Sequence, residues 1–330
     1  MRSGKELISC SKQFSCENRA RSWFELIITL VFTAIVFVAG FFEIIPVLVR
    51  LCASIVCALL YVRLFVIYHD YEHRAILQNS KVAQAIMTFV GVYLLAPEAI
   101  WKRSHEHHHN NNSKLTMHGI GSYPTISKER FLSLTKSQQR LYLVNRHPLI
   151  IFFGHFTLFI YWLNVKSFFE SPKKHIDSLV SLIFHFTSAA FVLYTFGFTI
   201  FFVGWFLPFF IAFGIGSYLF YAQHNFPEAQ FCENNDWAYD KAAITSTSKM
   251  VMNPVMNWFT GNIGYHHVHH LNSRIPFYRL REAMESMAEL NNAPTTSLHP
   301  VEMARCLSLK VWDAKLGKMI TLRQLKQSIA

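Results

Sequence analysis

Histidines are concentrated in three short stretches of the sequence. In "YHDYEHR", His69 and His73 lie four residues apart. The stretches "RSHEHHHNN" and "GYHHVHH" share an i, i+3, i+4 pattern, formed by His105, His108 and His109 and by His266, His269 and His270. On a helix this spacing places the rings on one face. Because neutral imidazole is the commonest metal-binding side chain, the pattern predicts metal ligation.

The number of rings indicates two metal ions. His224, in "FYAQHNFPE", adds a ninth candidate to the eight on these faces, whereas His107 and His267 fall off them. One tetrahedral ion needs only four ligands. Imidazole suits iron, zinc, copper and nickel, but zinc is redox-silent and no HExxH or GxSxG motif is present. A nitrogen-ligated pair of irons best fits oxidation of an apolar substrate from a membrane.

Long apolar segments place these histidines beside a bilayer. Hydrophobic residues make up 52% of the chain and charged residues only 15%, against about 25% charged in soluble domains. Residues 24–68 are about twice as long as one span, which needs ~20 residues, and Gly40 and Pro46 mark a turn. Residues 178–196 and 198–221 form a second pair around Gly197. The sequence predicts an all-α integral membrane protein: two transmembrane helical hairpins (about four spans), interfacial helices and a cytosolic cap with the His-ligated di-iron site.

Shorter features leave alternatives open. Residues 82–100 and 148–164 could each be a span or an interfacial or re-entrant helix. His185 lies within a span, and without a nearby partner in the sequence it is expected to serve packing. Arg63, near the end of the second helix, is expected to reach toward the interface. The tail, residues 305–330, could lie on an anionic leaflet or form a solvated helix.

The positive charges predict an orientation. The net charge is +11, and Lys and Arg precede each hairpin but are missing from the short turns. By the positive-inside rule, both termini and all histidine groups face the cytosol. The expected membrane is a bacterial inner membrane rather than an endoplasmic reticulum or plastid membrane. The expected divisions are a cytosolic tail (1–22), a first hairpin (23–68), a cytosolic or interfacial region (69–175), a second hairpin (176–222) and a cytosolic region with a basic tail (223–330).

The histidine boxes resemble those of the membrane-bound fatty acid desaturase family. The segments "HDYEH", "WKRSHEHHH", "RHPLIIF", "QHNF" and "GNIGYHHVHHLNSRIPFYRL" are similar to the acyl-lipid branch, which includes Δ12 (ω-6) oleate desaturases. The resemblance covers roughly residues 45–290. The first box departs from many relatives at Tyr71 and Glu72, where smaller residues are common. That departure bears on the position of the double bond more than on metal binding.

The resemblance implies a di-iron enzyme that uses O₂ to place a cis double bond in a long acyl chain. Two Fe ions, cycling between Fe²⁺ and Fe³⁺, would be held by His69, His73, His105, His108, His109, His224, His266, His269 and His270. Ligating histidines commonly donate their second N–H to a carboxylate or carbonyl. The candidates for such contacts are Asp70, Glu106, Gln223, Asn225 and Asn262.

Partners and competing functions follow from the same resemblance. The substrate would be an acyl lipid, acyl-CoA or acyl-ACP in the lipid bilayer. Because the sequence contains no haem or iron–sulfur motif, electrons would come from a separate ferredoxin or cytochrome b5-type donor. No pattern indicates nucleic-acid binding. The alternatives are a membrane di-iron hydroxylase or ketolase acting on alkanes, carotenoids or other lipids, and a non-enzymatic metal transporter or sensor.

Overall fold

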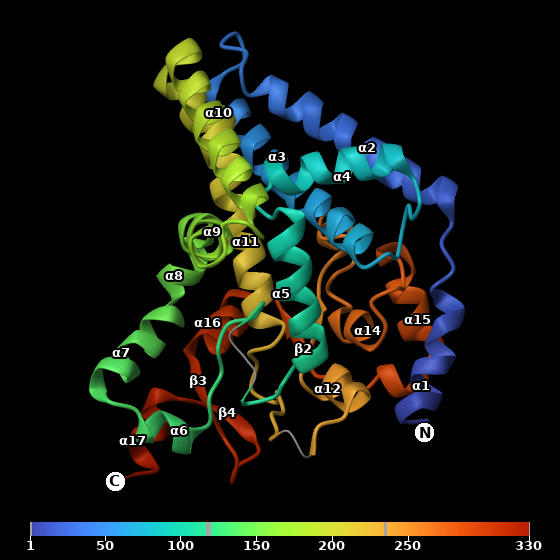
Figure 1. The fold of residues 1–330 in the computed structure, drawn as a ribbon, viewed down its shortest axis with the longest axis vertical. Helices are drawn as coiled ribbons and strands as arrows, with labels where there is room; N and C mark the ends of the chain where they lie inside the picture. Colours follow the sequence, from blue (N-terminus) through green and yellow to red (C-terminus); the bar gives the residue numbers. More distant parts are fainter. Residues whose placement is uncertain (1, 117–119, 234–235, 330) are drawn as a thin grey trace.

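Two pairs of long helices form the apolar part of the molecule (Figure 1). The computed structural model describes residues 2–116, 120–233 and 236–329. The first pair is α2 (Arg19–Ala39) and α3 (Val47–Glu72). The second consists of α10 (Ile176–Ile200), η3 (Phe201–Phe206) and α11 (Leu207–Ala222). The helix α3 packs along both α2 and α11, so the two pairs form one body.

Local chemistry explains where these helices begin and turn. The side chain of Asn18 accepts a hydrogen bond from the Arg21 N–H and caps the start of α2. Gly40 follows the last turn of α2, and Pro46 directly precedes α3. Gly197 interrupts the second apolar segment with a φ of +79°, a conformation that glycine adopts without strain. Both segments therefore fold back on themselves as hairpins.

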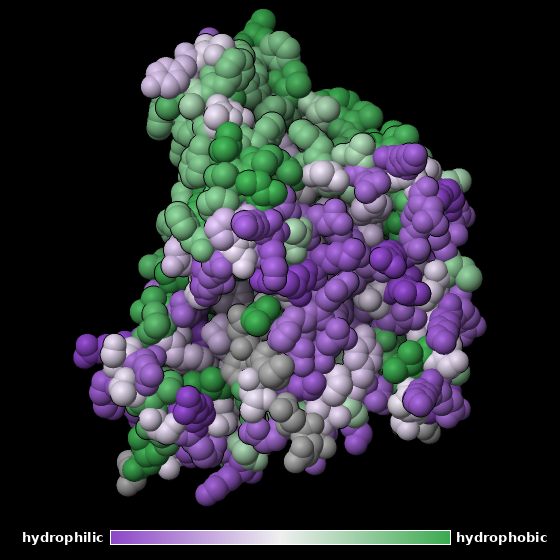
Figure 2. Space-filling model, viewed as in Figure 1, coloured by the Kyte–Doolittle hydropathy of each residue, from purple (hydrophilic) through white to green (hydrophobic). Residues whose placement is uncertain are grey.

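The long helices are suited to a membrane. Three helical stretches are long and apolar enough to cross one: Arg19–Ala39, Val47–Glu72 and Ile176–Ala222. The third contains the break at Gly197, and a further candidate is the pair α4 (Lys81–Tyr93) and α5 (Glu98–Asn111), bent by 86°. Figure 2 shows hydrophobic side chains gathered over the helical hairpins and hydrophilic ones over the opposite end. The predicted all-α membrane fold class is confirmed.

The ambiguous run at 148–164 is helical, and one of its faces packs against α10 and α11 while the other is exposed. It comprises α8 (Pro148–Phe152) and η2 (His155–Lys166), whose backbone has wide, i→i+5 turns. Nε2 of His155 lies 3.1 Å from Nε2 of His185 on α10. His185 is buried, which agrees with the packing role expected for it. Its partner lies 30 residues earlier in the chain, on a helix whose packing the sequence did not reveal.

Short elements form the polar end of the molecule. The helices are α1 (Gly4–Ser11), η1 (Lys12–Phe14), α6 (Lys128–Ser133), α7 (Lys136–Asn145), α9 (Ser167–Glu170), α12 (Tyr239–Thr245), α13 (Pro254–Phe259), α14 (His266–Leu271), η5 (Phe277–Arg279), α15 (Leu280–Ser286), η6 (Ala288–Leu290), α16 (Pro300–Ser308) and α17 (Leu322–Gln327). Strand β1 (Lys249–Val251) pairs in parallel with β2 (Thr295–Ser297), and β3 (Leu309–Asp313) pairs antiparallel with β4 (Lys318–Thr321).

The C-terminal tail differs from both sequence interpretations. Most of it is the hairpin of β3 and β4 followed by the short α17, rather than one surface helix. Val311 and Ile320 on this hairpin are buried against Phe131 of α6 and Tyr142 of α7. The tail therefore forms a small separate hydrophobic core together with α6 and α7. Its apolar residues alternate because they belong to β strands and not to a helix.

Candidate metal centre

The nine predicted ligand histidines converge in two adjoining groups. One group contains His69, His73, His105, His109 and His269, and the other contains His108, His224, His266 and His270. Within each group one ring nitrogen per residue lies within 4.8 Å of all the others. Neither group includes His107 or His267. The eight rings that helix spacing placed on common faces therefore lie together, with His224 as the ninth, whereas His107 and His267 lie outside both groups.

Each ring is carried by the end of a helix. The last turn of α3 supplies His69, and His73 follows it directly. The helix α5 begins after Pro97 and carries its three rings in its final turns. His224 lies two residues beyond the end of α11. The short α14 supplies the remaining three rings.

Two glycines bring α14 close to its neighbours. A Cβ atom on Gly264 would lie 2.6 Å from the carbonyl oxygen of Met250 in β1. Gly261 has a φ of +52°, and a Cβ there would lie 2.8 Å from Cγ1 of Val66 in α3. Larger residues would push the loop away from both elements. The "GNIGY" sequence before the third histidine group therefore permits the close approach that the site requires.

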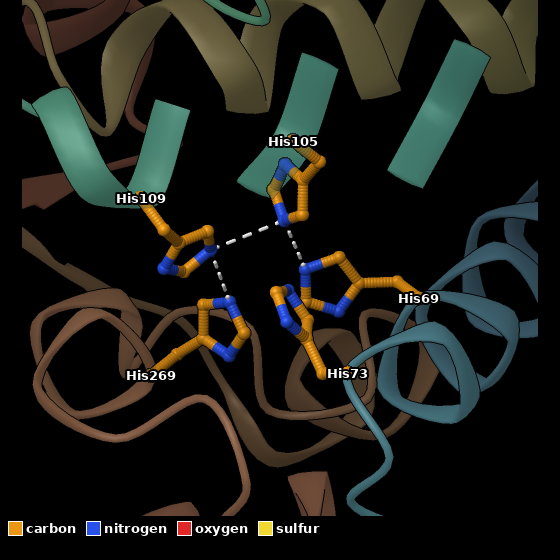
Figure 3. A group of neighbouring side chains, drawn as sticks. All are labelled: His69, His73, His105, His109 and His269. Carbon is orange, nitrogen blue, oxygen red and sulfur yellow. Dashed lines mark hydrogen bonds between the residues drawn. The ribbon is translucent and has the colours of Figure 1, made fainter. Parts of the chain in front are cut away.

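The five-histidine group is a ring of facing nitrogens (Figure 3). Nε2 of His105 lies 2.8 Å from Nε2 of His69 and 3.2 Å from Nε2 of His109. Nε2 of His269 lies 3.0 Å from Nε2 of His109. Nε2 of His73 is buried and has no hydrogen-bond partner among the described residues. The group thus draws nitrogen donors from α3, α5 and α14 to one point.

The four-histidine group has the same construction. Nε2 of His224 lies 3.1 Å from Nε2 of His108 and 2.9 Å from Nε2 of His266. Nε2 of His270 lies 3.1 Å from Nε2 of His266. The rings of His109 and His270 stack with centroids 4.2 Å apart, so the two groups share a wall. Two metal positions would therefore be close neighbours.

Burial keeps these rings neutral. It lowers the pKa of His224 to about 4 and the pKa values of His266, His269 and His270 well below 6.5. A neutral imidazole has one N–H and one lone pair, so hydrogen bonds between rings cannot satisfy every inward nitrogen in such a cluster. A cation accepts all of the inward lone pairs at once. The donor set therefore fits metal ions, with the Nε2 atoms as ligands.

The five candidate supporting residues have different surroundings. The carboxylate of Asp70 lies 3.2 Å from Nδ1 of His69, and its other oxygen accepts the Phe277 N–H at 2.6 Å. The Asn262 amide donates to the carbonyl oxygen of the same Phe277 at 3.2 Å. Of the two acidic candidates, Asp70 is therefore the one that contacts a histidine ring. Asn262 contacts the backbone of Phe277, to which Asp70 is also hydrogen-bonded.

The other three candidates have other contacts. Glu106 is exposed and lines a surface recess with Lys102 and Arg103 instead of facing a ring nitrogen. Asn225 binds Arg146 and donates to the carbonyl oxygen of Cys306 at 2.7 Å. The Gln223 amide donates to the Ile263 carbonyl oxygen at 2.8 Å, and its side chain lines a cavity beside the histidines.

That cavity is apolar and leads away from both histidine groups. Its volume is about 50 Å³, which makes it a narrow passage, and His69 and His266 lie on its wall. The remaining lining residues are Tyr61, Val62, Phe65, Val66, Phe159, Ala212, Phe213, Gly216, Leu219, Phe220, Gln223 and Ile263. Sequence reasoning did not identify them. One available signal was the i, i+4 series of Tyr61, Phe65 and His69, which shares one helix face.

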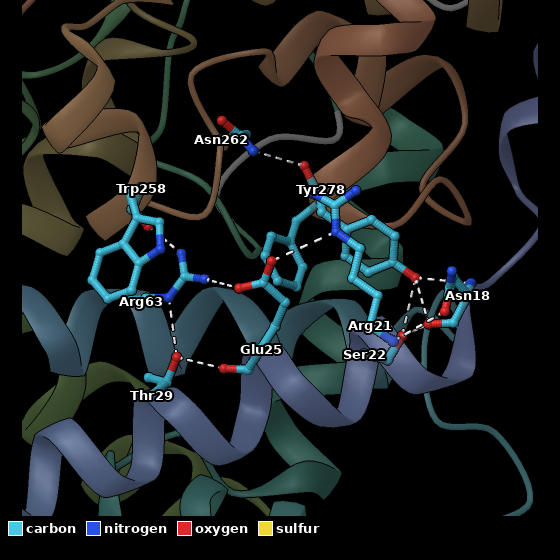
Figure 4. Close-up of polar contacts among 10 residues, drawn as sticks. Asn18, Arg21, Ser22, Glu25, Thr29, Arg63, Trp258, Asn262 and Tyr278 are labelled. Carbon is cyan, nitrogen blue, oxygen red and sulfur yellow. Dashed lines mark hydrogen bonds and ion pairs between the residues drawn. The ribbon is translucent and has the colours of Figure 1, made fainter.

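A buried ion pair joins α2 and α3 of the first hairpin, and its arginine also contacts Trp258 of α13, close to α14 in the sequence (Figure 4). The guanidinium of Arg63 lies 2.5 Å from Glu25 of α2, donates to Thr29 at 3.0 Å and covers the Trp258 ring at 4.0 Å. Arg63 is only 2% exposed. The expectation that it reaches the interface was wrong, because a carboxylate and an indole face it inside the protein.

Known proteins share this chain's sequence pattern. The family model described as fatty acid desaturase matches residues 44–299. The chain belongs to the fatty acid desaturase family. This desaturase family acts on lipids and consists of oxidoreductases, and the membrane helices and histidine groups described above agree with membership.

Individual relatives are distant but cover most of the chain. A fatty acid desaturase of Bacillus subtilis is 28% identical over 84% of this chain and 79% of its own length. An sn-1 oleoyl-lipid 12-desaturase of Anabaena variabilis is 24% identical, over 83% of this chain and 78% of its own. A chloroplastic omega-6 fatty acid desaturase of Arabidopsis thaliana is 24% identical over 78% of this chain and 54% of its own length.

Proposed function

We propose that this desaturase holds two iron ions in its two histidine groups and places a cis double bond in a long acyl chain, at the Δ12 or ω-6 position. The arrangement that carries this proposal is the contact between the two histidine groups and an apolar cavity, which His69 and His266 both line. The names of the Anabaena and Arabidopsis relatives support the position. The substrate class is an acyl lipid, with acyl-CoA and acyl-ACP as other carriers.

When bound, the iron pair would supply the electrons and coordination positions with which O₂ is reduced. In the overall reaction, two adjacent methylenes each lose one hydrogen. O₂, two electrons and two protons from outside account for the two waters that leave. The electrons come from a separate donor, for which we propose a ferredoxin, since one relative from Nostoc is named an sn-1 acyl-lipid omega-3 desaturase (ferredoxin).

The protein's own residues would bind the acyl chain and orient it. An alkyl chain offers no hydrogen bonds, so the cavity wall alone decides which carbons lie beside the histidines. His69 and His266 line this cavity directly. On the other side of the four-histidine group, a separate polar cavity is lined by His108, His224, Asn112 and Thr125. We assign the apolar side to the substrate and the polar side to protons and product water.

We also propose a topology. Residues 1–22 and 223–330 lie on the cytosolic side, and residues 69–175 lie on that side or at its interface with the membrane. The hairpins at 23–68 and 176–222 lie in a bacterial inner membrane. The asymmetry of Lys and Arg supports this orientation. Both histidine groups then face the compartment in which a soluble electron donor is available.

Fatty-acid analysis of an expressing strain tests the function. The host should contain monounsaturated but no diunsaturated acyl chains, and the donor should be co-expressed. We expect a diunsaturated product that requires oxygen. A hydroxylated or keto product, with no diene, would instead indicate the related hydroxylase or ketolase chemistry. No lipid change, with metal bound and donor present, would contradict an enzymatic role.

A further inference from the structure

We propose that Tyr61 and Tyr93 form the floor of the acyl cavity, so that the new double bond is placed at a fixed distance from the methyl end of the chain. The inference rests on the proposed function and names what determines position within that same site. It concerns the end of the cavity that is remote from the histidines.

Two helices give the cavity its direction. On α3 the lining side chains run from Tyr61 through Phe65 to His69. Tyr61 and His69 are eight residues apart, a distance of about 12 Å along the helix axis. On α11 they run from Ala212 through Gly216 to Gln223. Both helices end near the histidines, so Gln223 and His69 mark one end of the cavity and Tyr61 and Ala212 mark the other.

Tyr61 lines the remote end of the cavity, and the rings of Tyr93 and Phe209 pack behind it. The hydroxyl groups of Tyr61 and Tyr93 are hydrogen-bonded to each other. The ring of Phe209 packs against both, with centroids 5.0 Å from Tyr61 and 5.1 Å from Tyr93. Because the two hydroxyls satisfy each other, the floor presents apolar ring surface to the cavity. A terminal methyl group can rest there without stranding a polar atom.

A groove lies beyond this floor. Tyr93 also lines an apolar groove between α2, α3 and α4, together with Leu30, Phe37 and Phe89. The Tyr61–Tyr93 pair thus separates the inner cavity from a second apolar space. Shortening the Tyr61 side chain would open the floor toward this groove, so a deeper position for the acyl chain becomes available.

A closed cavity of fixed depth sets a rule for counting carbons. The methyl end stops at the floor, and the carbons beside His69 and His266 are then a constant number of methylenes away. Lengthening the chain would move its carboxyl end outward without changing which carbons react. A site that counted from the carboxyl end, or from an existing double bond, would behave in the opposite way.

The test uses the full-length protein in membranes with its electron donor. It is supplied with a monounsaturated fatty acid and with two analogues lengthened at the methyl end by one and two methylenes. The existing double bond stays at the same carbon from the carboxyl group. Mass spectrometry then locates the new double bond. We expect a constant distance from the methyl end. A constant distance from the carboxyl end would overturn the inference and leave the proposed function intact, whereas no diene from any chain would overturn both.

Variants test the floor residues themselves. Tyr61→Leu should deepen the cavity and move the new double bond at least one carbon farther from the methyl end. Ala212→Leu should raise the floor and move it at least one carbon closer. Tyr61→Phe keeps the ring and should leave the position unchanged, as should Tyr218→Leu, which alters a buried tyrosine of α11 outside the lining. Active Tyr61→Leu and Ala212→Leu enzymes that keep the wild-type position would refute the assignment.

A mid-cavity variant provides a further check because the added atom makes only ordinary contacts. A Cβ atom on Gly216 would lie 3.8 Å from Cζ of Phe159, which is an ordinary contact. Alanine therefore fits there, and it narrows the cavity between floor and histidines. We expect Gly216→Ala to lower the yield from the longest chain relative to the shortest, with the double-bond position unchanged. Equal yields would contradict passage of the acyl chain along this face.

Discussion

At the scale of single residues, the site depends on the side of each helix that a ring occupies. His107 and His108 are adjacent on α5, yet only His108 belongs to a converging group. His107 contacts Asn111 instead. A matched pair of substitutions on one helix can therefore separate loss of a metal ligand from a general disturbance of α5.

We expect His108→Ala to abolish desaturation, because the four-histidine group then keeps only three nitrogen donors. His107→Ala should retain at least about half of wild-type product, since an exposed or half-buried side chain away from the site usually contributes little. Diunsaturated product per unit of membrane-bound protein is the measurement. Equal activity in the two variants would argue against the four-histidine group as a metal site.

Asp70 and Glu106 form a second matched pair. Both carboxylates follow a ligand histidine directly in the sequence, but only Asp70 contacts a ring. Asp70→Asn should weaken metal affinity by about 10–100-fold, the usual effect of removing a carboxylate that orients a ligating histidine. Glu106→Gln should not change it. Titration of the metal-free variants with metal compares their affinities. Similar affinities in Asp70→Asn and Glu106→Gln would show that Asp70 does not support a metal-binding histidine.

Acid should destabilise the metal-free protein. The pKa of His224 is lowered to about 4 from 6.5, so between these values the unfolded chain binds more protons than the folded one. The stability that His224 contributes is present above pH 6.5 and is lost as the pH falls toward 4. For this residue alone the loss is about 3 kcal/mol. Unfolding at a series of pH values measures it, and His224→Gln should show a smaller fall. A free energy of unfolding that does not change between pH 6.5 and pH 4 would contradict a buried, neutral His224.

At the scale of elements, the sequence predicted the parts of the structure that depend on local spacing. The hairpins followed from apolar run length, and eight of the nine rings followed from i, i+4 and i, i+3, i+4 patterns, whereas His224 was chosen for its place after the second hairpin. Contacts between distant elements were not predictable in this way: Arg63 meets Glu25 and Trp258, and His185 meets His155. The neighbours Asp70 and Glu106 could not be separated either, because packing of η5 against the end of α3 decides which carboxylate is buried.

The Arg63–Glu25 pair should be important for stability. Glu25→Gln leaves the buried guanidinium without its carboxylate, and breaking such a pair costs about 3–5 kcal/mol. The exposed pair of Arg281 and Glu285 is the control, for which Glu285→Gln should cost less than about 1 kcal/mol. Thermal unfolding in detergent micelles compares the two. An equal, small effect would mean that Arg63 finds sufficient partners in Thr29 and Trp258.

At the scale of the whole molecule, hydrophobic side chains gather over the helical hairpins and hydrophilic ones over the opposite end (Figure 2). The sequence predicted this division, but it did not predict that the C-terminal tail forms a β hairpin with its own small core. That hairpin depends on contacts with α6 and α7, which lie far away in sequence.

The proposed topology can be tested by cysteine labelling in intact cells and in opened cells. Ile44, in the first turn, is 91% exposed, and Asn291 lies on the surface of the polar half. In a background in which the native cysteines are replaced, Ile44→Cys should react with an impermeant reagent in cells whose outer membrane is permeabilised. Asn291→Cys should react only after the inner membrane is opened. The reverse pattern would invert the orientation.

The central claim is that two metal positions lie between the nine histidines, and the iron content of the purified full-length protein tests it most directly. Elemental analysis should be made against quantitative amino-acid analysis, after expression with iron and donor available. We expect close to two irons per chain. Protein that catalyses desaturation at full rate with no iron, or that binds iron equally well after His105, His224 and His266 are all changed to alanine, would contradict the claim.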